Sequence, residues 1–203
     1  MSIPLAHFID RLAHLLPGET LNTPWYITDN LSMIIESMIP SCGNDYQICD
    51  GIAVHRTAVI EQHVVLKGPV IISEGVTVGA NAYIRGPVLL DRNVHIGAGC
   101  EIKQSAIFAS TAIAHFNYIG NSLIGSHVNF EAGSIAANHY NERENKIISV
   151  LHDDDVINTG VKKFGALVGD GSKIGANAVL SPGTILKKNS VVGRLELVEQ
   201  LKS

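Results

Sequence analysis

An aliphatic residue returns every six positions through most of this chain, and this period restricts the possible folds more than any other feature of the sequence. Neither the 3.6-residue period of an amphipathic helix nor the two-residue period of a half-buried strand produces it. The positions are Val54, Ile60, Leu66, Ile72, Val78, Ile84, Leu90, Ile96, Ile102, then, with two five-residue steps, Ile107, Ile113, Ile119, Ile124, Phe130, Ala136, and after a gap Val168, Ile174, Leu180, Leu186 and Val192.

A six-residue period is typical of a triangular coil in which each hexapeptide forms one short strand and one corner. The aliphatic residue then points into the prism, and three hexapeptides complete a coil of about eighteen residues. Successive coils stack through parallel hydrogen bonds at roughly 4.8 Å. We therefore expect an all-β fold, a parallel β-helix of hexapeptide repeats with about six coils, over residues 51–203.

Two segments lack the period. Residues 1–50 contain an apolar helical face from Leu5 to Leu16, stopped by Pro17-Gly18, and a second helix capped by Thr28 or Asp29. We expect this short N-terminal helical segment to cover the open edge of the first coil, because an unpaired edge promotes aggregation. The second segment, at about residues 137–166, is a polar insertion in the β-helix, and long insertions of this kind are usually functional.

Composition excludes several classes of partner. The net charge is −4 and no basic cluster is present, so nucleic acid is not expected as a partner. No apolar run reaches the roughly 18 residues of a transmembrane helix, so membrane insertion is not expected. The N-terminus also lacks the basic region of a signal peptide. Three sparse cysteines, Cys42, Cys49 and Cys100, favour a reducing, cytoplasmic location and do not have the spacing of a metal site.

Stacking of coils brings specific side chains together. Arg85 and Lys103 are eighteen residues apart, and each follows an inward aliphatic residue. They are either a phosphate-binding pair or two solvated surface charges. His115 occupies a coil position equivalent to Ala132, so its imidazole should lie beside the backbone of Ala132-Gly133. A neutral histidine can accept a proton from an amine, and neighbouring amides can stabilise a thioester oxyanion. A purely structural histidine is the alternative.

The segment from His115 to Asn138 resembles a known active-site stretch. Its His-x-x-Tyr…Asn…Ala-Gly…Asn spacing is similar to that of glucosamine-1-phosphate N-acetyltransferases, the acetyltransferase domain of bifunctional N-acetylglucosamine-1-phosphate uridyltransferases. The runs 82–85 and 101–103 also match, and residues 159–170 resemble archaeal-type members, so that the similarity covers about residues 52–192. It implies a left-handed coil, a homotrimer, and transfer of acetyl from acetyl-CoA to the amine of an amino-sugar phosphate.

The resemblance also implies roles for individual residues. These are general base for His115, orientation of the amine or the base for Asn138, phosphate binding for Arg85 and Lys103, sugar binding for Tyr118 and Asn129, and backbone contacts to acetyl-CoA for Ala132 and Ala176.

Three features depart from the pattern of this family. Glu131 replaces a glycine beside the Ala-Gly pair, and the lysine expected after Asn138 has only Lys146 as a candidate, in an altered spacing. No Gly-rich phosphate loop after a strand precedes the β-helix, so we expect no nucleotidyltransferase domain and no uridyl transfer.

Two other functions fit the same repeats. A non-catalytic or regulatory trimeric β-helix protein related to sugar nucleotidyltransferases would explain Glu131 and the missing domain. A γ-class carbonic anhydrase uses the same coil with zinc, but it needs a His-x4-His pair that the histidines from His55 to His139 do not form. No metal site is therefore expected.

Overall fold

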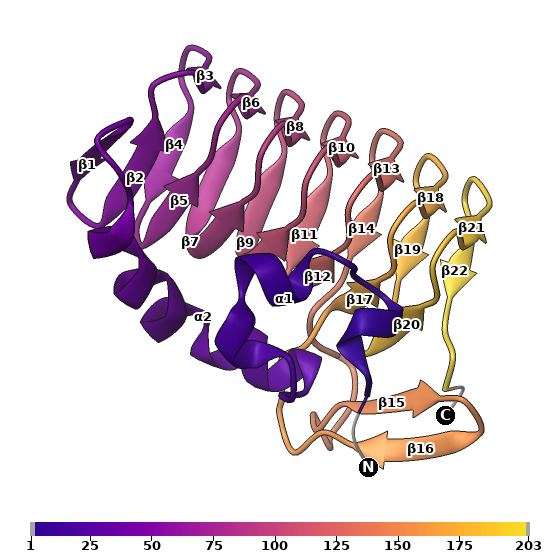
Figure 1. Cartoon of the computed structure of the whole chain (residues 1–203). Coiled ribbons are helices and arrows are strands. Elements are labelled where there is room, and N and C mark those ends of the chain that lie inside the picture. Colours follow the sequence, from indigo (N-terminus) through magenta and orange to yellow (C-terminus); the bar gives the residue numbers. More distant parts are fainter. Residues whose placement is uncertain (1–2, 202–203) are drawn as a thin grey trace.

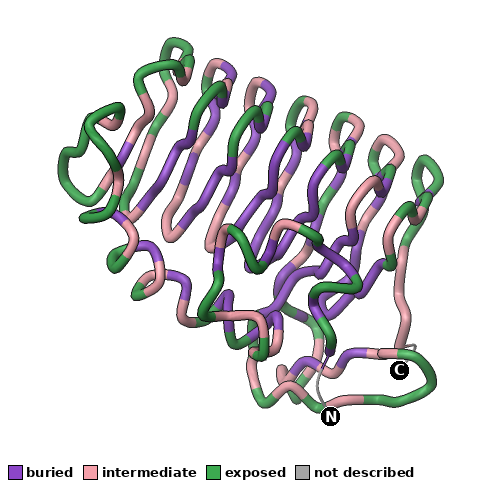
Figure 2. Tube along the Cα trace, viewed as in Figure 1, coloured by how far each residue is buried: buried purple, intermediate pink, exposed green. Residues whose placement is uncertain are grey.

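The fold predicted from the six-residue period is confirmed. The structure is a computed structural model that describes residues 3–201, and most of the chain winds into a parallel β-helix (Figure 1). The aliphatic residues of the series line its interior, fully buried in the central coils and partly buried in the first, as at Val54, Ile60 and Leu66. Figure 2 shows that the buried residues repeat from coil to coil and are concentrated in the central coils.

The prism has three faces, each a ladder of parallel strands. Face 1 consists of β3 (Val59–Ile60), β6 (Thr77–Val78), β8 (His95–Ile96), β10 (Ala112–Ile113), β13 (Asn129–Phe130), β18 (Lys173–Ile174) and β21 (Val191–Val192). Because each coil contributes one strand to face 1, the seven strands described there mean seven coils, one more than expected.

Two longer strands cross from face 2 to face 3 and join these faces into one sheet. The crossing strands are β7 (Tyr83–Leu90) and β9 (Glu101–Ile107). Face 2 holds their first halves together with β4 (Val65–Lys67), β11 (Tyr118–Gly120), β14 (Ile135–Ala136), β19 (Val179–Leu180) and β22 (Leu197–Val198). Face 3 holds their second halves together with β2 (Ile52–His55), β5 (Val70–Ile72), β12 (Leu123–Ile124), β17 (Ala166–Val168) and β20 (Thr184–Leu186).

Face 3 carries a straight column of outward apolar residues. Each stands one position before an inward residue and is in register with its neighbours on adjacent coils: Ala53, Ile71, Leu89, Ala106, Leu123, Leu167 and Ile185. All seven are buried in a second apolar cluster together with N-terminal side chains such as Phe8, Leu12, Trp25 and Leu31. The N-terminal segment therefore covers face 3.

The placement of the N-terminal helices differs from the one expected. They run along face 3, where α2 (Pro24–Met38) packs on β7 and β9, and do not cover the edge of the first coil. That edge is instead paired antiparallel with β1 (Tyr46–Cys49). Burial of the apolar column explains the difference, because a whole face offers more apolar surface than one coil end.

The helices themselves also differ from the predicted ones. The first helical stretch is broken into η1 (Leu5–His7), α1 (Leu12–Leu15) and η2 (Pro17–Glu19), and η3 (Ile39–Ser41) follows α2. Helix α2 begins earlier than predicted, with Thr23 as N-cap and Pro24 in the first turn, a position that proline favours.

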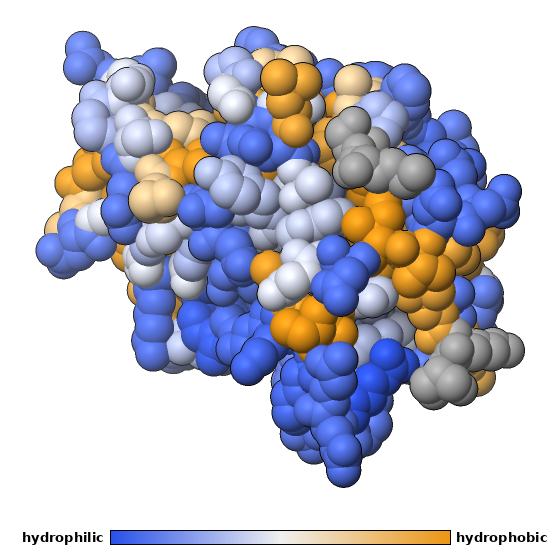
Figure 3. All heavy atoms as spheres, turned by 90° about the horizontal axis from the view of Figure 1, so that it is seen from below, coloured by the Kyte–Doolittle hydropathy of each residue, from blue (hydrophilic) through white to orange (hydrophobic). Residues whose placement is uncertain are grey.

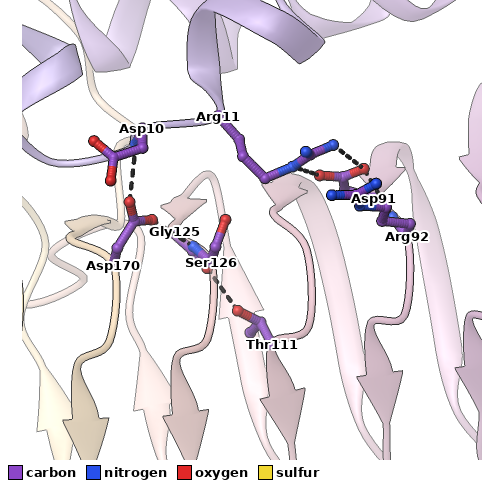
Figure 4. Close-up of polar contacts among 8 residues, drawn as sticks. All are labelled: Asp10, Arg11, Asp91, Arg92, Thr111, Gly125, Ser126 and Asp170. Carbon is purple, nitrogen blue, oxygen red and sulfur yellow. Dashed lines mark hydrogen bonds and ion pairs between the residues drawn. The ribbon is translucent and has the colours of Figure 1, made fainter.

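Polar contacts attach the N-terminal segment to two coil corners (Figure 4). The Arg11 guanidinium pairs with the buried carboxylate of Asp91 at 2.8 Å, and the Asp10 amide donates to Asp170 at 2.8 Å. Asp170 in turn donates its own amide to the Phe8 carbonyl at 2.8 Å. These contacts fix the segment near both the middle and the later coils.

The polar insertion leaves the β-helix between β14 and β17. Phe130 pairs with Ile174, 44 positions later, whereas Ile113 pairs with Phe130 after only 17. The extra residues include an antiparallel hairpin of β15 (Ser149–His152) and β16 (Asp155–Asn158), and β15 packs near β20. On the side that carries the helices and this hairpin, the surface is mostly hydrophilic with scattered apolar patches (Figure 3). None of the helices described is long and apolar enough to cross a membrane.

Candidate active site

The two cations predicted to stack do so on face 2. Arg85 of β7 is in register with Lys103 of β9, so their side chains leave adjacent coils from equivalent positions. Glu101 is the carboxylate nearest to this pair, with its Oε1 3.5 Å from Arg85 Nε. Arg85 Nε is buried and makes no hydrogen bond to any group of residues 3–201. Arg85 and Lys103 could therefore both donate hydrogen bonds to a bound anion.

Lys103 lies in a positive environment. Partial burial lowers the pKa of its ammonium group most, and the charges of Lys163 and Arg85 lower this pKa further, against an opposing effect of Glu101. Lys163 lies at the end of the polar insertion, whose return to face 3 brings it beside face 2. Like charges this close favour binding of an anion, which would remove their mutual repulsion.

Tyr118 and Asn138 meet one coil beyond Lys103. Gly120 of β11 is in register with Lys103, and a Cβ on Gly120 would lie 2.6 Å from the Tyr118 hydroxyl and 2.9 Å from Asn138 Nδ2. Both groups thus occupy the space above this glycine. Asn138 is buried, and its Nδ2 donates to Asn121 Oδ1 at 2.6 Å. Burial raises the pKa of the Tyr118 hydroxyl, and the Glu101 charge raises it further, so this group remains a donor at neutral pH.

His115 lies exposed at the corner between face 1 and face 2. The Gly133 amide donates to the His115 carbonyl at 2.9 Å, which makes Ala132 the equivalent residue on the next coil, as the spacing predicts. The neighbouring Phe116 is 73% exposed and has a φ of 56°, a left-handed conformation that is uncommon for a large side chain. The corner therefore presents a histidine and an exposed aromatic ring together.

Two of the backbone amides expected to contact acetyl-CoA already have acceptors. The Gly133 amide is used by the His115 carbonyl, and the Ala176 amide donates to Glu131 Oε2 at 2.9 Å. Neither bond engages the amide of Ala132, an exposed residue at the same corner. Of these three amides, that of Ala132 is therefore the one most available to donate to a thioester carbonyl.

The charge of Glu131 is compensated. Arg194 donates to both of its oxygens, at 2.8 and 3.0 Å. Arg194 and the Ala176 amide together lower the pKa of this carboxyl. The carboxylate that departs from the family pattern is consequently an ion-paired group and not a bare negative charge beside the site.

The structure separates the remaining predicted residues. Asn129 is exposed on β13 of face 1, across the corner from Tyr118 of face 2. Asn138 lies beside Tyr118, in the space above Gly120. The Lys146 ammonium donates to carbonyls within the insertion, of Tyr140 at 3.4 Å and Asn141 at 3.0 Å. Face 2 therefore gathers the phosphate candidates and Tyr118, while the corner gathers the histidine and the backbone positions.

Sequence reasoning missed three charged groups of face 2. Lys67 is in register with Arg85, and the eighteen-residue spacing extended one coil back would have found it. Glu101 could have been found as the residue two positions before Lys103. Lys163 carries no such signal, because its approach depends on the path of the insertion. Among residues 3–201, no group of three or more His, Cys, Asp or Glu side chains is arranged to hold a metal ion.

Family models match two parts of the chain. The model described as the GMPPB C-terminal domain matches residues 66–162, and the model described as the hexapeptide repeat of succinyl-transferase matches residues 165–193. Both matches fall on the β-helix and its insertion.

Curated relatives agree with the resemblance seen in the sequence. A "Bifunctional protein GlmU" of Methanococcus vannielii is 30% identical over 89% of this chain and 44% of its own length. A "Bifunctional sugar-1-phosphate nucleotidylyltransferase/acetyltransferase" of Sulfurisphaera tokodaii is 31% identical over 80% of this chain and 41% of its own length. A "Bifunctional protein GlmU" of Streptococcus uberis is 32% identical over 87% of this chain and 40% of its own length. The chain thus spans less than half the length of these relatives.

A solved structure of a GDP-perosamine N-acetyl transferase mutant from Caulobacter crescentus, in complex with CoA and GDP-perosamine, aligns with 70% of this chain and 50% of its own. It does so at 15% identity with a TM-score of 0.36, too weak a likeness to support an argument.

Proposed function

We propose that this chain, a hexapeptide-repeat relative of the bifunctional sugar-1-phosphate nucleotidylyltransferase/acetyltransferases, transfers an acetyl group from acetyl-CoA to the amine of an amino-sugar phosphate resembling glucosamine-1-phosphate. One observation carries the proposal. The stacked Arg85 and Lys103 are followed on face 2 by Tyr118 and Asn138, which meet above Gly120, and Gly120 belongs to the same coil as His115.

The residues order the acceptor along face 2. Arg85 and Lys103 hold its phosphate through charge-assisted hydrogen bonds. The Tyr118 hydroxyl and the Asn138 amide then lie at the height of the sugar ring, on the level of the coil that contains His115. Asn129 approaches the same corner from face 1 and adds a second polar contact. Fixing the acceptor in this way removes much of the entropic barrier of a two-substrate reaction.

His115 acts as general base in a direct transfer. The amine nitrogen attacks the thioester carbonyl carbon, the C–N bond forms, and the C–S bond breaks as the CoA thiolate leaves. The imidazole accepts the proton that the amine loses and passes it to the departing thiolate. The Ala132 amide is the backbone donor best placed to stabilise the oxyanion formed during the attack. Acetyl-CoA is consumed as a co-substrate, and the chain forms no covalent intermediate.

Assembly into a homotrimer would complete the site. Face 3 is covered by the N-terminal segment, so faces 1 and 2 remain for self-association. Exposed apolar side chains surround the corner between these two faces: Val59, Val65, Phe116, Ile135, Val191, Leu195 and Leu197. Such a surface requires a partner, and a second copy seated there would enclose acetyl-CoA between neighbours. Sedimentation at micromolar concentration tests the assembly, and a stable monomer contradicts it.

A second candidate is a non-catalytic β-helix protein. The observation that favours it is the Glu131 carboxylate, which occupies the Ala176 amide that a coenzyme would use. Calorimetric titration with CoA distinguishes the two candidates, because a non-catalytic protein has no reason to bind the coenzyme.

Replacement of the proposed base tests the acetyltransferase directly. His115→Ala should lower kcat for glucosamine-1-phosphate acetylation by about 10²–10⁴-fold while leaving CoA affinity nearly unchanged. Arg85→Ala should mainly raise the KM of the sugar phosphate, because it removes binding and not proton transfer. Release of free thiol from acetyl-CoA provides the assay.

His127→Ala is the matched control, since His127 is also an exposed histidine and lies at a different corner of the prism. It should retain wild-type turnover. If His115→Ala also retains wild-type turnover on every amino-sugar phosphate tried, His115 is not the base and the proposal fails.

A further inference from the structure

The cationic column on face 2 is longer than a single phosphate requires. Lys67 of β4 is in register with Arg85, as Arg85 is with Lys103, so three consecutive coils each present a cation from the same position. Lys67 Nζ lies 5.2 Å from the centroid of the Tyr83 ring, and Arg85 Cζ lies 5.8 Å from it. Lys67 and Arg85, the first two cations of the column, are thus both attracted to the same aromatic ring.

The charges of the column are poorly compensated. Glu101 approaches Arg85 at 3.5 Å, while Lys163 adds a further positive charge near Lys103. Four cations and one carboxylate give this part of face 2 a net charge of +3, on a chain whose net charge is −4. A concentration of positive charge against the overall sign indicates an anion site.

The length of the column indicates which anion. Adjacent coils are roughly 4.8 Å apart, so three cations extend over roughly 10 Å. One phosphate can bridge two adjacent coils, either Lys67 with Arg85 or Arg85 with Lys103. Two linked phosphates are needed to engage all three.

We propose that face 2 binds a diphosphate, with one phosphate on Arg85 and Lys103 and the other on Lys67 and Arg85, so that the acceptor is a nucleoside-diphosphate amino sugar. This inference rests on the proposed acetyl transfer for the orientation of the ligand. The sugar lies toward Tyr118 and Asn138, and the nucleoside extends over the first coils. Coenzyme A also contains a diphosphate, and the test must separate the two sources.

Titration calorimetry of the full chain with inorganic phosphate, pyrophosphate, UDP and CoA provides the test. Pyrophosphate and UDP should bind about tenfold or more tightly than phosphate, since each added charge-assisted contact contributes about that factor. Lys67→Ala should remove most of this advantage while changing phosphate affinity by less than about threefold. Lys103→Ala should weaken the binding of phosphate, pyrophosphate and UDP.

Arg92→Ala is the matched control, because Arg92 is an exposed cation at another corner of the prism. It should leave the advantage of pyrophosphate intact. Equal affinities for phosphate and pyrophosphate would overturn the inference. So would a Lys67→Ala variant that loses CoA affinity and keeps UDP affinity, since the column would then belong to the coenzyme.

The two proposals fail in different ways. If the diphosphate binds as expected but neither UDP-glucosamine nor glucosamine-1-phosphate is acetylated, the acetyltransferase falls and the diphosphate site stands. If glucosamine-1-phosphate is acetylated and pyrophosphate has no advantage over phosphate, the acetyltransferase stands and the diphosphate site falls.

Discussion

Truncation of one side chain under the N-terminal segment tests whether that segment covers face 3. Leu123 points outward from β12, in register with Ala106 and Leu167, and it is fully buried. Leu123→Ala removes three carbon atoms, which amounts to about 2.4 kcal/mol of transfer free energy. The cavity left behind brings the expected loss of unfolding free energy to about 3–4 kcal/mol. In a chain of this length, that corresponds to a fall in Tm of about 6–16 °C.

Leu21→Ala is the matched control, because Leu21 is a leucine of the N-terminal segment itself, between η2 and α2. It is 91% exposed and lies outside the surface proposed for self-association, so its truncation should cost about 1 kcal/mol or less. Urea unfolding followed by circular dichroism measures both variants. Equal losses for the two variants, or a loss below about 1 kcal/mol for Leu123→Ala, would refute the assignment of face 3 as the covered face.

Three further predictions follow from single contacts. Gly120→Ala should reduce acetyl transfer by about tenfold or more and also lower Tm, because its Cβ displaces the Tyr118 ring and the buried Asn138 amide, which donates to Asn121; wild-type activity would contradict this geometry. Carbon-13 NMR should find that the pKa of Glu131 lies below the ordinary value of a glutamate and that Arg194→Ala raises this pKa. The lowered pKa means that the Glu131 contribution to stability is present above the unfolded pKa and is lost as the pH falls through the folded one. Arg11→Ala should cost about 1–3 kcal/mol in urea unfolding, because it leaves the buried Asp91 carboxylate without its partner; a cost near zero would show that the pair does not attach the segment.

The interior of the β-helix could be read from the sequence because its determinants are local. Each hexapeptide places its own aliphatic residue inside, and the next repeat does the same without reference to distant parts of the chain. The register of Arg85 with Lys103, and of His115 with Ala132, followed from counting residues around one coil. The same counting, extended one coil, would have added Lys67.

The course of the N-terminal segment could not be read in the same way. Its apolar residues required burial, but the open first coil and an outer face of the prism both offered apolar surface. The column that includes Leu89 and Leu123 decided between them, and it is a property of stacked coils. The sequence does contain an apolar residue directly before every third inward residue. This pattern identifies the covered face only after the three faces of the prism have been distinguished.

The sequence by itself determined the coil, its core and the positions that share a height on the prism, because a repeat folds against its own neighbours. Only the tertiary structure decided which groups remain available for chemistry. The capture of the Ala176 amide by Glu131 and the approach of Lys163 to Lys103 each join segments whose separation no period encodes. The physical reason is that a repeat specifies where a backbone passes, whereas hydrogen bonds and charges depend on what every other segment brings to the same place.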